Sequence, residues 1–440
     1  MEYIKRTKET ALRQFIELNQ EHKDVLVVSG ARQVGKTTLI NHVLDSMARR
    51  SSRIDLEKKP SFATKIDMTK DFDEFTKLLA DELSFYPDNN DVLFIDEAQL
   101  GRKLGSYVRF MKEEWKNATV ILSGSLIGEL HNADIRRPVG REKHLQLWPF
   151  TFKEFLKAIG HDSLADALEN YALGKELTKL THERLVGDYD VFLKIGGLPA
   201  VIDAYKNGLN WRDTIMDIFK TYEDDFIRYF GIENTNLFSR SLSALAANVG
   251  SPSKNSQIIK IDAPGYKRVA GILARLELWC MVIKVEQVGK TPEQSNFPPK
   301  RYLYDMGILN HLRFKGRPDF ALSEIEDAFL KTAFGGIVEN AVVISLKDQA
   351  MEVVGIKLSK NSEIDFGVRF GDEIIPIECK AAKKFKPQYA TSVINYCGLF
   401  QLKRGVVFNL SPPCKFESGN IIIYSLPAYM ADETERLFAR

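Results

Sequence analysis

The chain has 440 residues, of which 44% are hydrophobic and 27% are charged, so it holds enough apolar material for about two to four domains with cores of their own. Its formal net charge of +2 excludes a uniformly cationic coat for nucleic acids. No apolar run approaches the roughly eighteen residues that span a bilayer, and the first residues lack a secretory apolar stretch, so we expect a cytoplasmic protein without membrane contact.

Residues 1–150 alternate apolar strands with amphipathic helices, which predicts an α/β domain with a parallel sheet covered on both faces. Within it, Gly30–Thr37 is a complete G-x-x-x-x-G-K-T phosphate-binding loop directly after the apolar run Val25–Val28. The strand before the loop and the helical pattern after it disfavour the alternative, an ordinary glycine turn. The residues expected to contact the nucleotide are Gly30, Ala31, Arg32, Gln33, Val34, Gly35, Lys36, Thr37 and Thr38.

This loop predicts ATP and Mg²⁺ as ligands. Its backbone N–H groups and the N-terminus of the following helix bind phosphates. Lys36 reaches the β- and γ-phosphates in such a loop, and the hydroxyl of Thr37 binds the metal ion.

A second buried-strand pattern, Val92–Ile95, ends in Asp96 and Glu97 and is typical of a Walker B strand. A carboxylate at the carboxyl end of a parallel strand holds Mg²⁺ through water, and its neighbour orients the attacking water. We assign Asp96 the first role and Glu97 the second. The phosphate-binding loop supports this interpretation, because two acids at the end of a strand are common on their own.

The strand predicted at Ala118–Leu122 is followed by Ser123, a candidate sensor of the γ-phosphate, although a plain Ser/Gly turn also fits. Beyond it, Arg136, Arg137 and Arg141 lie in a stretch without an apolar period. One of them is a candidate arginine finger for the nucleotide of a neighbouring subunit, which would require an oligomer. Most loop arginines are simply solvated, so this alternative stays open.

Residues 151–236 follow a helical pattern that is broken at Gly196–Gly197, and we expect a helical lid or connector. Residues 237–310 combine two amphipathic helices with two predicted strands, Val282–Val285 and Arg301–Tyr304, around a loose loop. This order predicts a winged-helix domain.

The winged-helix segment is basic, with Arg268 and Arg275 on the outer face of its second helix. It has ten Lys and Arg residues against five Asp and Glu residues, and this excess is suited to neutralising DNA phosphates. Winged helices also dock proteins, so DNA and a protein partner both stay open. The basic residues are Arg240, Lys254, Lys260, Lys267, Arg268, Arg275, Lys284, Lys290, Lys300 and Arg301.

Residues 311–440 contain two adjacent predicted strands, of which the first carries Asp365 and the second carries Glu378 and Lys380 on one face. An acid on one strand and acid-x-lysine on the next is the arrangement of a PD-(D/E)XK nuclease-like fold. Asp365 and Glu378 would hold magnesium, Lys380 would position the hydrolytic water, and Glu339 would add a helical carboxylate. In the alternative, Glu378 and Lys380 merely pair and the domain is catalytically silent.

Several of these segments together resemble a widespread group of prokaryotic AAA-type ATPases that carry a C-terminal domain of unknown function. The resemblance implies ATP hydrolysis, marks Arg141 as the finger and Ser123 as the sensor, and implies no further reaction. The segments that carry it are 32–38, 95–99, 122–125, 140–141, 147–152, 195–199, 302–307, 339–340 and 377–380.

Two classes of function follow from the sequence. In the first, an ATPase domain drives a DNA-directed protein that holds or cuts DNA with its C-terminal part. In the second, the protein is a nucleotide-dependent regulatory switch with a silent nuclease-like domain that binds a protein partner. A basic groove beside Asp365 and Glu378 favours the first class, and a hydrophobic patch over them favours the second.

Overall fold

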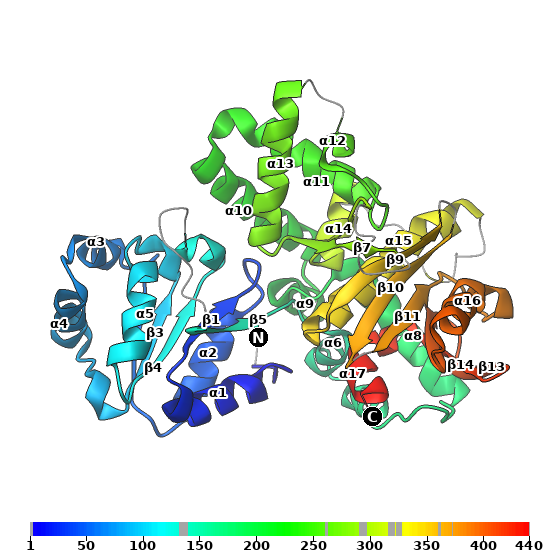
Figure 1. Cartoon of the computed structure of the whole chain (residues 1–440), viewed down its shortest axis with the longest axis horizontal. Coiled ribbons are helices and arrows are strands. Elements are labelled where there is room, and N and C mark those ends of the chain that lie inside the picture. The colour runs from blue at the N-terminus through cyan, green and yellow to red at the C-terminus, as the bar shows by residue number, and fades with distance from the viewer. Residues whose placement is uncertain are drawn as a thin grey trace. The chain divides into compact units, whose positions relative to one another are not determined.

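The computed structural model describes residues 3–131, 140–259, 263–289, 297–315, 322, 328–359, 362–371 and 373–439. The chain divides into two compact units (Figure 1). The N-terminal unit comprises Lys5–Trp148 together with Leu278–Cys280, and the C-terminal unit consists mainly of Pro149–Glu277 and Met281–Arg440. The division into four domains expected from the sequence stays a prediction.

The N-terminal unit is built on a five-stranded parallel sheet with the strand order β2-β3-β4-β1-β5. This confirms the parallel α/β sheet expected from the sequence. The strands are β1 (Val25–Ser29), β2 (Ser51–Asp55), β3 (Val92–Asp96), β4 (Thr119–Ser123) and β5 (Glu142–Gln146). The helices are α1 (Glu9–His22), α2 (Lys36–Asp45), α3 (Pro60–Met68), α4 (Phe72–Leu83) and α5 (Leu104–Glu114).

Both faces of this sheet are buried, which explains why its central strands are apolar throughout rather than alternating. Helices α3, α4 and α5 share one core with alternate strand residues such as Val25, Val27 and Ile95. Helix α1 packs against β4 and α2 (Figure 1). Because the five strands are parallel, their carboxyl ends lie at one edge of the sheet, where a ligand can reach the loops that follow them.

The first half of the C-terminal unit is helical and ends in a two-stranded antiparallel sheet, β6-β8. Its helices are α6 (Phe152–Ala158), α7 (Asp162–Glu169), α8 (Lys179–Ile195), α9 (Pro199–Lys206), α10 (Trp211–Phe230), α11 (Thr235–Ala247), α12 (Asn255–Ile258), α13 (Ala263–Leu278) and α14 (Met306–Phe314). The short strands in this half are β6 (Val282–Val285), β7 (Gln287–Val288) and β8 (Lys300–Leu303).

The second half is a seven-stranded mixed sheet with the order β13-β14-β12-β11-β10-β9-β7. Its further strands are β9 (Val353–Ser359), β10 (Ser362–Phe370), β11 (Glu373–Cys379), β12 (Arg404–Asn409), β13 (Cys414–Ser418) and β14 (Ile421–Pro427). Helix α16 (Thr391–Phe400) shares a core with alternate residues of this sheet, including Ile364, Val407 and Ile423. Helix α15 (Ala328–Asp348) packs against β8, β9 and β11.

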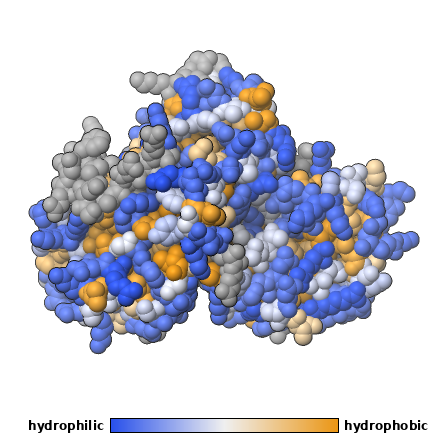
Figure 2. Space-filling view, turned by 180° about the vertical axis from the view of Figure 1, so that it is seen from behind, coloured by the Kyte–Doolittle hydropathy of each residue, from blue (hydrophilic) through white to orange (hydrophobic). Residues whose placement is uncertain are grey.

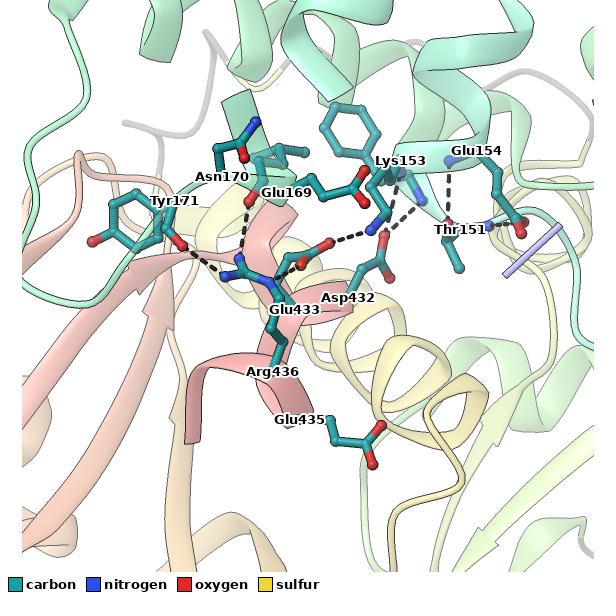
Figure 3. A network of polar contacts seen from close by, with 12 residues as sticks. Thr151, Lys153, Glu154, Glu169, Asn170, Tyr171, Asp432, Glu433, Glu435 and Arg436 are labelled. Atoms are coloured by element: carbon teal, nitrogen blue, oxygen red, sulfur yellow. Dashed lines mark hydrogen bonds and ion pairs between the residues drawn. The ribbon is translucent and has the colours of Figure 1, made fainter. Parts of the chain in front are cut away.

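The end of the chain, α17 (Thr434–Phe438) and the turn before it, is bonded to the helical half of the same unit (Figure 3). Asp432 accepts hydrogen bonds from the backbone N–H groups of Phe152 (2.8 Å) and Lys153 (3.4 Å) at the start of α6. The ammonium of Lys153 lies 2.7 Å from Glu433, which also pairs with Arg436 at 2.6 Å. The last turns of the chain therefore fix helix α6.

The elements predicted for residues 237–310 are present as α11, α13, β6 and β8, while the winged-helix assignment itself stays a prediction. Two of the ten basic residues counted in this segment are not available to DNA phosphates. Lys300 and Arg301 are 1% and 4% exposed, because β8 packs between other elements of the unit. Lys260 and Lys290 lie outside the described residues.

Hydrophilic residues cover most of the surface in the view of Figure 2, and apolar residues form separate patches. Among the helices of the described residues, none has the length and hydrophobicity needed to cross a membrane.

Candidate functional site

The phosphate-binding loop connects β1 to α2 and has the backbone that its glycines permit. Gly30 and Gly35 have φ angles of 147° and 95°, a backbone conformation that residues other than glycine rarely adopt. A Cβ atom on Gly30 would also lie 2.3 Å from the carbonyl oxygen of Leu147. Helix α2 begins at Lys36, so its N-terminus points its free N–H groups into the loop.

Lys36 is buried within the loop. Its ammonium donates to the carbonyl oxygens of Gly30 (2.9 Å) and Ala31 (3.0 Å). Burial lowers the pKa of Lys36, and the attraction of Glu97 and Asp96 opposes this shift. Asp96 and Glu97 therefore lie near enough to the loop lysine for their charges to act on it.

The hydroxyl of Thr37 donates to a carboxylate oxygen of Asp96 at 2.5 Å. Strand β4 lies between β1 and β3 in the sheet, and Ser123 at its end donates a short hydrogen bond to the other oxygen of Asp96. Both predicted metal-binding side chains thus meet, and the candidate sensor touches the same carboxylate.

Glu97 follows β3 in a left-handed conformation with φ 50°, which turns its side chain away from the strand direction. Its carboxylate accepts hydrogen bonds from Gln99 (2.7 Å) and from the hydroxyl of Ser125 (3.2 Å). Burial raises the pKa of Glu97, while the bond from Gln99 and the charge of Lys36 lower it. Gln99 and Ser125, which lie in two segments of the family resemblance, therefore hold the predicted water-orienting carboxylate.

Arg141 lies at the opposite end of the sheet from the loop. It directly precedes β5, and its carbonyl oxygen accepts from the backbone N–H of Val25 at the start of β1, whereas the loop follows the end of β1. Its guanidinium lies 2.7 Å from Glu113. Arg141 cannot reach the nucleotide loop of its own chain in this arrangement. Arg136 and Arg137 lie outside the described residues.

The second predicted site lies in the C-terminal unit, where the fold gathers residues from four elements. Glu339 on α15, Asp365 on β10 and Lys380 after β11 line one pocket of about 440 Å³, together with Lys300 on β8. Backbone segments 249–252 and 335–336 form much of the remaining wall. Gly250 permits this closure, because a Cβ atom there would lie 2.7 Å from Glu339.

A β-bulge aims Asp365 into the pocket. The register between β10 and β9 shifts between Ile364 and Gly367, so the bulge includes Asp365. One oxygen of Asp365 accepts from the backbone N–H of Cys379 at 2.8 Å. The carboxylate is therefore fixed to the neighbouring strand β11, which carries Glu378.

Glu378 is 8% exposed and makes a short hydrogen bond with the ammonium of Lys380. Its second oxygen, Oε2, is buried and has no hydrogen-bond partner among the described residues. Burial and the nearby charge of Asp365 raise the pKa of Glu378, and Lys380 opposes this. A buried carboxylate oxygen without a hydrogen-bond partner lowers the stability of the fold unless a cation or a hydrogen-bond donor contacts it.

The carboxylates do not form a ready three-ligand site. Among the residues that the structure describes, no three His, Cys, Asp or Glu side chains lie close enough together to hold a metal ion. Instead Glu339 contacts Lys300 at 3.0 Å and accepts a short hydrogen bond from Tyr302. Glu339, predicted as a metal ligand, is thus already bound to an internal cation.

Comparison with known proteins supports the N-terminal assignment. Residues 22–156 match the family model of an AAA domain, and this match contains the loop, Asp96 and Glu97. This segment is an AAA-type P-loop ATPase-like domain. Residues 186–319 match the model of a domain of unknown function, which spans the end of α8 through α14.

One relative and one solved structure are also similar to this chain. A protein of Haemophilus influenzae, described as uncharacterized, is 24% identical over 387 residues, which cover 84% of this chain and 86% of the relative. Among solved structures, a Walker-type ATPase of Pyrococcus abyssi aligns with 70% of this chain and 96% of its own, at 17% identity and a TM-score of 0.43.

Sequence reasoning missed Lys300 as a member of the C-terminal pocket and Tyr302 as a hydrogen-bond partner of Glu339. Both lie on β8, and alternation along a strand places them on one face while Arg301 points to the other. Arg301 pairs with Glu277 at 3.1 Å and donates to Asn255 at 2.6 Å. The spacing Lys-x-Tyr was visible in the sequence, but nothing local indicated that it faces Glu339.

Proposed function

We propose that the chain hydrolyses ATP in its AAA domain and acts on DNA with a magnesium-dependent site in its C-terminal unit. The convergence of Asp365, Glu378 and Lys380 from an antiparallel strand pair carries the second part of this proposal, because Glu378 keeps a buried oxygen without a partner. Hard oxygen donors of this kind suit magnesium or manganese.

In the AAA domain, Lys36 would release the loop carbonyls and bind the β- and γ-phosphates, and the N-terminus of α2 would face the phosphate charge. Thr37 and Asp96 would hold magnesium, which neutralises phosphate charge when bound. Glu97, held by Gln99 and Ser125, would orient the attacking water.

In the C-terminal unit, Asp365 and Glu378 would hold the metal ion, which polarises a phosphoryl oxygen when bound. Lys380 is partly exposed beside Glu378 and would hold the hydrolytic water. The water oxygen forms a bond to phosphorus, the ester P–O bond breaks, and the leaving oxygen takes a proton. The products are a phosphate monoester and an alcohol.

DNA would dock on the exposed face of α12 and α13. A groove there is lined by Lys254, Asn255, Lys267, Tyr266 and Phe297. Lysines supply charge for phosphates, and an aromatic ring offers a stacking surface for a base. Lys254 and Lys267 belong to the ten basic residues of this segment, whereas Lys300 and Arg301 are buried and cannot contribute to the groove.

Two sets of variants test the two activities separately. Lys36→Ala should abolish nucleotide binding, whereas Glu97→Gln should keep binding and stop turnover, with the exposed Lys58→Ala as control. Undiminished hydrolysis in Glu97→Gln would contradict the Walker B assignment.

In the second set, wild-type protein with manganese should cleave single- or double-stranded DNA, and Asp365→Ala or Lys380→Ala should stop cleavage without changing ATP hydrolysis. Exposed Lys384→Ala is the matched control.

One observation favours the alternative, a regulatory switch with a silent nuclease-like domain that binds a protein partner. Lys380 pairs directly with Glu378, and Lys300 pairs with Glu339 and Asp365, so the pocket is largely charge-paired without a metal. Absence of both DNA cleavage and manganese binding in the Lys36→Ala protein would select this alternative.

A further inference from the structure

Lys300 is a lysine buried among carboxylates. Its ammonium lies 3.0 Å from Glu339 and 3.3 Å from Asp365, and a third acid, Glu363, lies 3.9 Å away. These distances are those of ion pairs between an ammonium group and carboxylates, so Lys300 acts as an internal cation of the pocket.

This ammonium stands between Glu339 and Asp365, the two carboxylates that a second metal ion would have to bridge. The hydroxyl of Tyr302 bonds the same Glu339 oxygen that Lys300 contacts. Both donors come from one face of β8, so they hold Glu339 jointly. By contrast, Glu378 Oε2 is buried and has no partner among the described residues.

The charges of the pocket favour one divalent ion over two. Glu363 pairs more closely with Lys357, at 2.9 Å, than with Lys300, so three carboxylates, Glu339, Asp365 and Glu378, remain against the ammonium groups of Lys300 and Lys380. When these five groups are ionised, their net formal charge is −1, which becomes +1 with one divalent ion and +3 with two. A buried cluster with excess charge of either sign destabilises the folded protein.

We propose that Lys300 occupies the second-cation position of the C-terminal pocket and limits the site to one divalent ion held by Asp365 and Glu378. This inference rests on the proposed magnesium site and deepens it. Glu339 then holds Lys300 in place and is not a metal ligand, in contrast to the role expected from the sequence. Unlike a metal ion, a covalently attached ammonium cannot exchange with solvent.

Manganese titration followed by electron paramagnetic resonance tests this stoichiometry, in full-length protein without nucleotide and with the phosphate-binding loop disabled by Lys36→Ala. This background should bind one ion per chain. Adding Lys300→Met should raise the number to two, because the Glu339–Asp365 pair becomes free for an ion. Adding Lys300→Arg, which keeps the charge, should leave one, as should the control Lys284→Met, an exposed lysine on the facing strand β6.

Two carboxylate variants, made in the Lys36→Ala background with Lys300 and Lys380 unchanged, distinguish the carboxylate that holds Lys300 from the one that holds the ion. Glu339→Gln should retain the single ion with affinity within about twofold, and Glu378→Gln should lose it. Circular dichroism confirms that each variant is folded.

The outcomes distinguish this inference from the proposed function. An unchanged single ion in Lys300→Met, or loss of the ion in a folded Glu339→Gln protein, overturns the role of Lys300 and leaves the metal site standing. If Lys300→Met does not fold, the Glu339→Gln result decides. No bound ion in the Lys36→Ala background overturns both proposals.

Discussion

The hydroxyl of Thr37 donates a 2.5 Å hydrogen bond to Asp96, a residue that lies 59 positions later in the chain. The contact forms because β1 and β3 run parallel and end at the same edge of the sheet. It joins two side chains that the sequence marks as magnesium ligands.

Thr37→Val should therefore lower ATP hydrolysis by roughly tenfold or more, since it removes a hydroxyl that would hold the metal ion and leaves the shape of the side chain unchanged. Steady-state hydrolysis at several magnesium concentrations measures the effect, and the magnesium requirement should rise. The control is Thr64→Val on α3, whose hydroxyl bonds only the carbonyl of Pro60 at 3.2 Å. Equal losses in both variants would contradict a special role for Thr37.

Arg141 is predicted to act on the nucleotide of a neighbouring subunit, because it lies at the far end of the sheet from its own loop. Arg141→Ala should slow hydrolysis by roughly tenfold or more and leave nucleotide affinity nearly unchanged. Specific activity of the wild type should rise with protein concentration. The control is Arg109→Ala, which removes a neighbouring guanidinium that pairs with the same Glu113. Activity independent of concentration would make Arg141 a structural residue.

We expect ionisation of Asp432 to lower the free energy of unfolding as pH rises. Burial raises the pKa of Asp432 to about 7 from 3.8, and hydrogen bonds from Ser345 and Phe152 only partly oppose this. Because the folded-state pKa is the higher one, the stability that Asp432 contributes is complete below about pH 3.8 and is lost as pH rises through about 7.

Asp432→Asn removes this titration and keeps an acceptor for the N–H groups of α6. It should exceed the wild type in free energy of unfolding by about 1 to 4 kcal/mol at pH 8, with a smaller gain at pH 5. Denaturant unfolding at both pH values measures this. Glu435→Gln is the control, since it removes an exposed carboxylate from the same segment (Figure 3). A less stable Asp432→Asn protein at pH 8 would mean that the charge at the start of α6 stabilises the fold.

Charge reversal at the proposed docking groove should weaken DNA binding. Lys254→Glu combined with Lys267→Glu should lower affinity by roughly tenfold or more at low salt and reduce its salt dependence, because fewer counterions are released. Fluorescence anisotropy with a labelled duplex at several salt concentrations measures both quantities. Lys179→Glu, 89% exposed on α8, is the control. Equal affinity in all three proteins would place DNA elsewhere or favour a protein partner.

Local sequence was sufficient for features built from consecutive residues. The loop Gly30–Thr37 is specific because its glycines, lysine and threonine act through backbone conformations and contacts set within the loop and the first turn of α2. The two acids at the end of the β3 segment, Asp96 and Glu97, and the paired strands that carry Asp365 and Glu378 were likewise visible as short patterns. Strand alternation then gave the shared face of Glu378 and Lys380.

Contacts between distant segments required the tertiary structure. Gly197 donates to Asp305 at 2.8 Å, and a Cβ atom on Gly307 would lie 2.3 Å from the carbonyl of Ile195, so two segments of the family resemblance pack against each other. The sequence showed both segments but not their contact. Their role in the structure is close backbone packing.

The same limit explains why the count of basic residues could not show that Lys300 is buried. A basic residue beside a loose loop is usually solvated, and period-2 alternation gives two faces without saying which of them is covered. Packing of β8 against α15 buries Lys300 and Tyr302 beside Glu339, and the bulge in β10 brings Asp365 to the same point. The sequence by itself determined which chemical groups are available, and long-range packing decided which of them share one pocket, because burial depends on elements far apart in the chain.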